Sequence, residues 1–135
     1  MKAAAEAAAA GETGLTVLGV TVLTSMNQQD LGETGVAGSV EEQVLRLGRL
    51  AIESGCGGVV ASAHEARAIR RELGGKFAIV TPGVRPAGAA KGDQARVVTP
   101  KDAIAAGATH LVVGRPITEA ENPVSAARAI LEEMR

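Results

Sequence analysis

Two short turns rich in glycine and proline carry the residues best suited to bind a phosphate group. In the first, Arg85 lies between prolines in the sequence Thr-Pro-Gly-Val-Arg-Pro at 81–86. In the second, Gly114 and Arg115 directly follow the apolar run 110–113. Glycine lets a backbone approach a ligand closely, and a guanidinium donates two parallel hydrogen bonds to phosphate oxygens. The alternative is a pair of tight turns whose arginines are only solvated.

Two further polar residues suit the recognition of a ligand near these turns. Gln94 lies in the long loop 81–98, which holds three glycines and two prolines and which we expect to close over a substrate as a flap. Its amide both donates and accepts, so it can bridge two polar groups of one ligand. Thr24 ends an apolar run, where its hydroxyl can contact the polar edge of a ligand. The alternatives are that Gln94 is an exposed loop amide and that Thr24 only caps a turn.

The histidines and the cysteine show no pattern of a nucleophile or a metal site. His64 lies in the first turn of a predicted helix and His110 starts a predicted strand, and neither has acidic or cysteine partners at ligand spacing. The single cysteine, Cys56, excludes an intramolecular disulfide and a zinc site of several cysteines. We therefore expect a buried thiol, no metal and no cofactor.

Composition excludes several classes of function. The 135 residues include 14 Lys+Arg and 15 Asp+Glu, with a net charge of −1, and the only aromatic residue is one Phe. This balance predicts no binding to nucleic acid or membrane, and no apolar run approaches the roughly 20 residues of a membrane helix. The Ala-rich start at 1–10 contains Glu6, so we interpret it as a short helix ended by Gly11 rather than as a secretory signal. We expect one cytoplasmic domain that binds a small molecule.

The elements that must position these residues alternate between strand and helix. After the helix at 1–10, the pattern predicts strands at 15–23, 58–61, 77–80 and 110–113, and helices at 39–54, 62–73, 99–107 and from 122 onwards. Capping boxes at Ser39 and Ser62 start two of the helices. Four strand–helix units require a parallel sheet. An open doubly wound sheet and part of a (β/α)8 barrel both fit, and phosphate-type turns after the last two strands favour the barrel.

Four blocks of sequence together resemble orotidine 5′-phosphate decarboxylase of the bacterial type. The blocks lie at 20–26, at 58–62, at 81–86 with 92–96, and at 113–118. The resemblance covers nearly the whole chain but only the C-terminal half of the enzyme. It implies an α/β fold that is the C-terminal half of a TIM (β/α)8 barrel, with residues 1–135 forming a single partial barrel domain.

The resemblance also implies a function, in pyrimidine (UMP) biosynthesis. Members of the family convert orotidine 5′-monophosphate to UMP and CO2 without a cofactor, using a Lys and Asp array in the N-terminal half. No Asp-x-Lys-x-x-Asp stretch occurs here, so the resemblance implies a truncated enzyme without catalytic residues. It assigns substrate binding to a set of five residues: Thr24, Arg85, Gln94, Gly114 and Arg115. Two alternatives stay open: a related sugar-phosphate decarboxylase, which usually needs a metal held by acidic residues, and a non-enzymatic phosphate-binding half-barrel.

A half-barrel has consequences for assembly. Its sheet leaves two edges, at 15–23 and 110–113, which are apolar and carry no Lys or Pro to discourage pairing. We expect Val17, Val59 and Ile79, or their neighbours on the inward face, to meet water. The last helix is predicted to carry an apolar stripe of Val124, Ala127, Ile130 and Leu131. The chain is therefore predicted to form a homo-oligomer through these edges or to aggregate.

Overall fold

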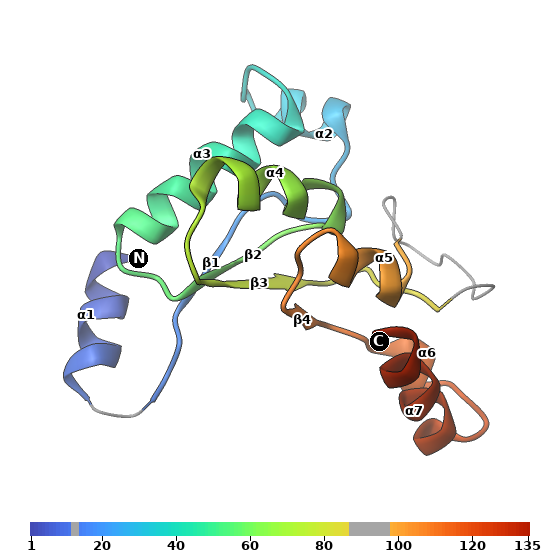
Figure 1. Cartoon of the computed structure of the whole chain (residues 1–135). Coiled ribbons are helices and arrows are strands. Elements are labelled where there is room, and N and C mark those ends of the chain that lie inside the picture. Colours follow the sequence, from blue (N-terminus) through green and yellow to red (C-terminus); the bar gives the residue numbers. More distant parts are fainter. Residues whose placement is uncertain (12–13, 87–97) are drawn as a thin grey trace.

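Four parallel strands form the sheet predicted from the sequence. A computed structural model describes residues 1–11, 14–86 and 98–135. The strands lie in chain order across the sheet, β1 (Leu18–Val20), β2 (Gly58–Val60), β3 (Ala78–Thr81) and β4 (His110–Leu111), as Figure 1 shows. The register aligns Val20, Val60, Val80 and His110 in one row. This order places β1 and β4 at opposite edges of the sheet.

Seven helices are found among the described residues: α1 (Lys2–Ala10), α2 (Gln28–Glu33), α3 (Val40–Glu53), α4 (Ala63–Leu73), α5 (Pro100–Ala105), α6 (Arg115–Thr118) and α7 (Pro123–Glu133). Ser39 starts α3 with the predicted capping box, in which its hydroxyl accepts from the Glu42 N–H and the Glu42 carboxylate accepts from the Ser39 N–H. Ser62 caps α4 by accepting from the His64 N–H. The predicted reciprocal box with Glu65 is not found, and Glu65 is buried.

One face of the sheet is covered by α3 and α4 and forms the main core (Figure 1). Val59 and Ile79 are fully buried there, against Val44 of α3 and Ile69 of α4. A side chain at Gly19 would overlap the side chain of Ala51, so α3 lies directly on β1. The helix-facing side of each strand therefore supplies the core.

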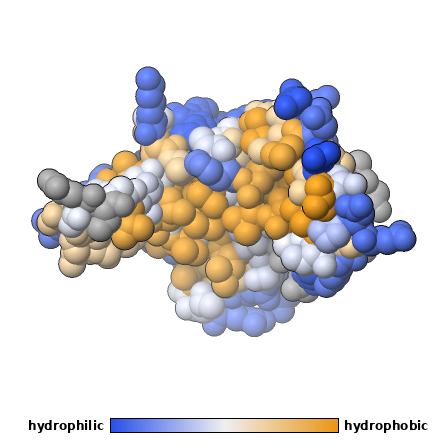
Figure 2. Space-filling model, turned by 90° about the horizontal axis from the view of Figure 1, so that it is seen from below, coloured by the Kyte–Doolittle hydropathy of each residue, from blue (hydrophilic) through white to orange (hydrophobic). Residues whose placement is uncertain are grey.

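The opposite face of the sheet carries apolar side chains that none of the described helices covers (Figure 2). Val20 is 58% exposed, and its row neighbours Val60 and Val80 are half-buried. Of the residues expected to meet water, Val59 and Ile79 are buried, because alternation along a strand points them toward the helices. Val17 is also partly buried against the helix-side core. The stated alternative, that neighbours on the inward face meet water, holds for the exposed Val20 and in part for the half-buried Val60 and Val80.

Several boundaries differ from the sequence prediction. Only Leu18–Val20 of the predicted strand 15–23 pairs with β2, although Thr21 and Val22 are buried beyond it. The strand predicted at 110–113 is likewise only His110–Leu111. Single backbone hydrogen bonds continue beyond the assigned strands, from the Thr21 N–H to the Val60 carbonyl and from the Val112 N–H to the Thr81 carbonyl. The regular pairing register ends at Val20 and at Leu111.

Two short helices, α2 and α6, were not predicted. Asn27 forms a capping box with Asp30 at the start of α2, a signal that the sequence contains. Helix α6 has four residues and begins with Arg115 and Pro116. Helices this short leave almost no periodic pattern.

The apolar stripe of α7 is only partly covered. Ile130 is buried, but Val124 is 63% and Leu131 is 58% exposed. Helix α7 contacts α5 and α6 rather than the main core (Figure 1). The predicted apolar stripe therefore has one buried member, Ile130, and two exposed members.

Candidate functional site

The candidate binding residues lie where the chain leaves the carboxyl ends of the strands. Thr24 follows β1, Arg85 follows β3, and Gly114 with Arg115 follows β4. Since the strands are parallel, these ends meet at one rim of the sheet. Gln94 lies outside the described residues.

Gly114 forms the N-cap of the short helix α6. The carbonyl of Gly114 accepts hydrogen bonds from the N–H groups of Ile117 at 2.8 Å and Thr118 at 3.1 Å, and Pro116 has no N–H. The N–H groups of Ile117 and Thr118 are therefore used within α6. A Cβ added at Gly114 would meet nothing within 4 Å, so the space beside this backbone is open. A short extra helix after the last strand is how (β/α)8 barrels commonly bind phosphate.

Arg85 is held in a second turn at the same rim. Its side chain is buried, and its Nη1 donates to the Val84 carbonyl at 2.9 Å. Its backbone N–H donates to the Val98 carbonyl at 3.1 Å, so the two ends of the loop 85–98 are joined. Arg85 is thus fixed by its own turn, whereas Arg115 is exposed. These two arginines follow neighbouring strands, β3 and β4.

Thr24 and the Gly114 turn follow strands at opposite edges of the sheet. Thr24 is buried, and it follows β1, which is three strand positions from β4. Three spacings correspond to roughly 14 Å along a flat sheet. Arg85 and the Gly114 turn therefore follow adjacent strands, β3 and β4, whereas Thr24 follows β1 at the opposite edge.

Thr81 is a buried polar residue at this rim that sequence reasoning did not single out. It ends β3, is 1% exposed, and its Oγ1 has no hydrogen-bond partner among the described residues. Its position at the start of the Pro82-Gly83 turn was the available signal. A buried hydroxyl without a partner is costly, so Thr81 is a further candidate for a ligand or water contact.

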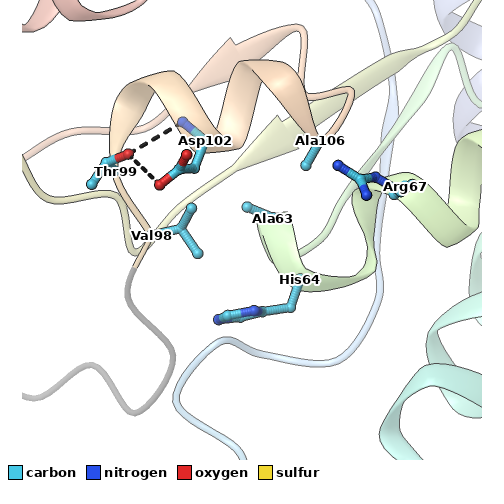
Figure 3. A pocket seen from close by; sticks show the side chains of 7 residues that line it. All are labelled: Ala63, His64, Arg67, Val98, Thr99, Asp102 and Ala106. Carbon is cyan, nitrogen blue, oxygen red and sulfur yellow. Dashed lines mark hydrogen bonds between the residues drawn. The ribbon is translucent and has the colours of Figure 1, made fainter.

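A pocket of about 490 Å3 lies between the N-terminal turns of α4 and α5, outside the predicted set of residues (Figure 3). His64 and Arg67 come from α4, and Thr99 and Asp102 from α5. The Thr99 hydroxyl donates to the Asp102 carboxylate at 2.8 Å and accepts from the Asp102 N–H at 3.2 Å. Asp102 is thus engaged in capping α5.

The resolved pKa shifts lie away from the rim. Hydrogen bonds from the Ser39 N–H and hydroxyl lower the pKa of Glu42, and the neighbouring Glu72 carboxylate raises the pKa of Arg71. Within residues 1–11, 14–86 and 98–135, no three His, Cys, Asp or Glu side chains gather as a metal site. In the same residues, no helix has the length and apolar character needed to span a membrane.

The sequence as a whole matches the model of one protein family over residues 1–130, the orotidine 5′-phosphate decarboxylase / HUMPS family. The chain belongs to this family. The resemblance stated from the four sequence blocks is therefore confirmed.

Solved structures of orotidine 5′-phosphate decarboxylases share the fold. The chain is 37% identical to the enzyme from Lactobacillus acidophilus, with a TM-score of 0.82 over 99% of this chain and 57% of that one. An uncharacterized conserved protein from Geobacillus kaustophilus is 32% identical, with a TM-score of 0.77 and the same coverage. The enzyme from Pyrococcus horikoshii is 34% identical, with a TM-score of 0.55 over 71% of this chain and 43% of that one.

The chain spans little more than half the length of the first two of these structures. Orotidine 5′-phosphate decarboxylases are TIM barrels, and the four parallel strands with their helices correspond to about half of one. The predicted fold class is therefore confirmed.

Proposed function

We propose that this chain is the substrate-binding half of an orotidine 5′-phosphate decarboxylase. It binds orotidine 5′-monophosphate and UMP through their phosphate and pyrimidine groups and performs no decarboxylation by itself. The observation that supports this most directly is the turn at Gly114, which opens a short helix at the carboxyl end of the last strand. The buried Arg85 turn follows the adjacent strand.

Each residue then has a part in binding. The backbone N–H groups of Gly114 and Arg115 point at phosphate oxygens, and the Arg115 guanidinium binds two of them. Arg85 adds a second positive charge, and Gln94 bridges the phosphate and the pyrimidine. Thr24 contacts the pyrimidine edge at the other side of the rim. Binding energy from the phosphate can then be used to close the loop and stabilise the transition state.

The chemical step needs a group that this sequence lacks. Loss of CO2 leaves an electron pair on C6 of the pyrimidine, and a positioned acid must protonate that carbon. In the family this acid is a Lys within an Asp-x-Lys-x-x-Asp stretch, which does not occur in these 135 residues. We therefore expect binding without turnover and no requirement for a cofactor.

Calorimetric titration tests the binding half of the proposal. UMP should bind measurably and uridine far more weakly, and Arg115→Ala should reduce UMP affinity roughly 10- to 150-fold, since a charge-assisted contact contributes about 1.5–3 kcal/mol. Arg128→Ala, which removes an exposed arginine on α7, is the matched control and should leave affinity unchanged. Equal affinity for UMP and uridine would refute the phosphate site.

Two further measurements separate this function from its alternatives. Ribose 5-phosphate should compete poorly with UMP, because it lacks the pyrimidine; equal competition would favour a sugar-phosphate enzyme or a general phosphate-binding module. Protein purified from a host without its own decarboxylase should form no UMP from orotidine 5′-monophosphate. Turnover by that preparation would overturn the predicted lack of chemistry.

A further inference from the structure

The hydroxyl of Thr81 is a buried hydrogen-bond donor that this structure leaves unused. Thr81 is 1% exposed, and its Oγ1 has no hydrogen-bond partner among the described residues. Thr109, beside the amino end of the same strand, differs, because its hydroxyl donates to the Ile79 carbonyl at 3.1 Å and accepts from the Ile79 N–H at 3.0 Å. A buried hydroxyl without a partner lowers stability, so position 81 favours valine unless another state of the molecule uses the hydroxyl.

Arg85, in the turn that follows β3, has donors engaged within its own turn. Its Nη1 donates to the Val84 carbonyl at 2.9 Å, and both residues are buried. Because Arg85 is only 7% exposed, its guanidinium must turn outward before it can reach a phosphate. When it then binds two phosphate oxygens through both terminal nitrogens, Nη1 leaves the Val84 carbonyl.

The Val84 carbonyl then needs a new donor. Val84 is fully buried in a small apolar cluster between α4 and α5, where water does not reach it. A buried carbonyl without a donor costs about as much free energy as a lost hydrogen bond. Phosphate binding by Arg85 is therefore weakened unless another group of this turn replaces Nη1.

We propose that Thr81 is this replacement: when Arg85 turns to bind a phosphate, the Thr81 hydroxyl donates to the Val84 carbonyl. Thr81 lies three residues before Val84, and Gly83, with a φ of 74°, bends the chain between them. Pro82 has no N–H that could compete for the carbonyl. The exchange keeps the carbonyl paired and gives the unused hydroxyl a partner, so Thr81 acts as a positioning residue for Arg85. This inference rests on the proposed phosphate contact of Arg85.

Calorimetric titration with UMP and urea denaturation test the exchange on the intact chain. Thr81→Val removes the hydroxyl with little change in shape. It should leave the urea midpoint unchanged or higher, because the hydroxyl has no partner before binding, and it should weaken UMP binding about 5- to 150-fold, because the Val84 carbonyl then stays unpaired in the bound state. Thr81→Ser keeps the hydroxyl and should bind UMP nearly as tightly as the wild-type chain.

Thr109→Val is the matched control, since it removes a hydroxyl that is already bonded at the opposite end of β3. It should lower the urea midpoint and leave UMP affinity unchanged.

The outcomes separate this inference from the proposed function. A wild-type chain that does not bind UMP would overturn both. UMP binding that Thr81→Val leaves unchanged would overturn the donor exchange alone. A lower urea midpoint for Thr81→Val would do the same, because the hydroxyl would then have a partner before binding. Equal losses of affinity in Thr81→Ser and Thr81→Val would also contradict the exchange, since the hydroxyl would then have no effect of its own.

Discussion

The two faces of the same sheet differ sharply in what they contact. On one, Val59 and Ile79 are fully buried beneath α3 and α4. On the other, Val60 and Val80, one residue further along the same strands, remain half-buried, and Val20 is largely exposed. Both sets are apolar and β-branched, so residue type does not separate them. Only the presence of a packed helix does.

This difference shows that the apolar composition of a strand indicates burial in the complete fold, not which face the nearest helices cover. Strands buried on both faces are nearly continuous apolar runs, as in parallel sheets. The strands here have that pattern, but the described residues cover one face only. The second face of the sheet is therefore apolar although none of the described helices packs on it.

The largest effect should come from the covered face. Ile79→Ala should lower the free energy of unfolding by about 2–5 kcal/mol, because it leaves a cavity against α3 and α4. Val80→Ala, its neighbour on the open face, should cost about 1 kcal/mol or less in dilute protein. Urea denaturation measures both. Similar losses for the two variants would show that the faces are equally packed and would break the comparison.

The close approach of α3 to β1 gives the next largest effect. Gly19→Ala should destabilise the protein by about 1–3 kcal/mol, since the added methyl group overlaps the side chain of the buried Ala51. Gly32→Ala is the control, because a Cβ at Gly32 in α2 meets nothing within 4 Å. That variant should be neutral or slightly stabilising in thermal unfolding. A tolerated Gly19→Ala would mean that α3 packs less closely than described.

Removal of a helix cap should lower global stability more for α3, which packs on the main core, than for α7, which lies beside it. Ser39→Ala removes the cap of α3 and should lower the global free energy of unfolding by about 1 kcal/mol. Asn122 caps α7 by accepting from the Ser125 N–H at 3.0 Å, and α7 does not contact the main core helices α3 and α4. Asn122→Ala should therefore increase hydrogen exchange in 123–133 with a smaller change in global stability. An equal global loss would place α7 in the main cooperative unit.

The smallest effect should be a pH dependence at the start of α3. The pKa of Glu42 is lowered from its ordinary value of 4.5 by hydrogen bonds from Ser39. A lowered pKa in the folded state contributes stability that is present above pH 4.5 and is lost as the pH falls through the lowered pKa. Glu42→Gln should remove this acid sensitivity from denaturation curves recorded across that range. An unchanged slope would show that the capping carboxylate is not coupled to folding.

Much of the fold and part of the site could be predicted from local sequence. The Ser39 box, the Ser62 cap and the Pro at the start of α5 each mark a helix through contacts within four residues. The turns at Arg85 and Gly114 could be found because glycine and proline fix backbone geometry locally. Helix α6 could not, because a helix of four residues leaves almost no periodic pattern. The burial of Thr81 and the pocket beside His64 could not either, since both depend on elements that are distant in sequence.

The sequence by itself determined that four strands alternate with helices, that the sheet is parallel, and that two turns rich in glycine and proline follow the last two strands. These properties arise from spacing, capping and residue type. Only the tertiary structure decided which side of each strand is buried, where β1 and β4 end, and that Arg85 is enclosed while Arg115 is exposed. The physical reason is that burial and strand pairing depend on a neighbour, and a strand that is apolar on both faces does not specify which face that neighbour will cover.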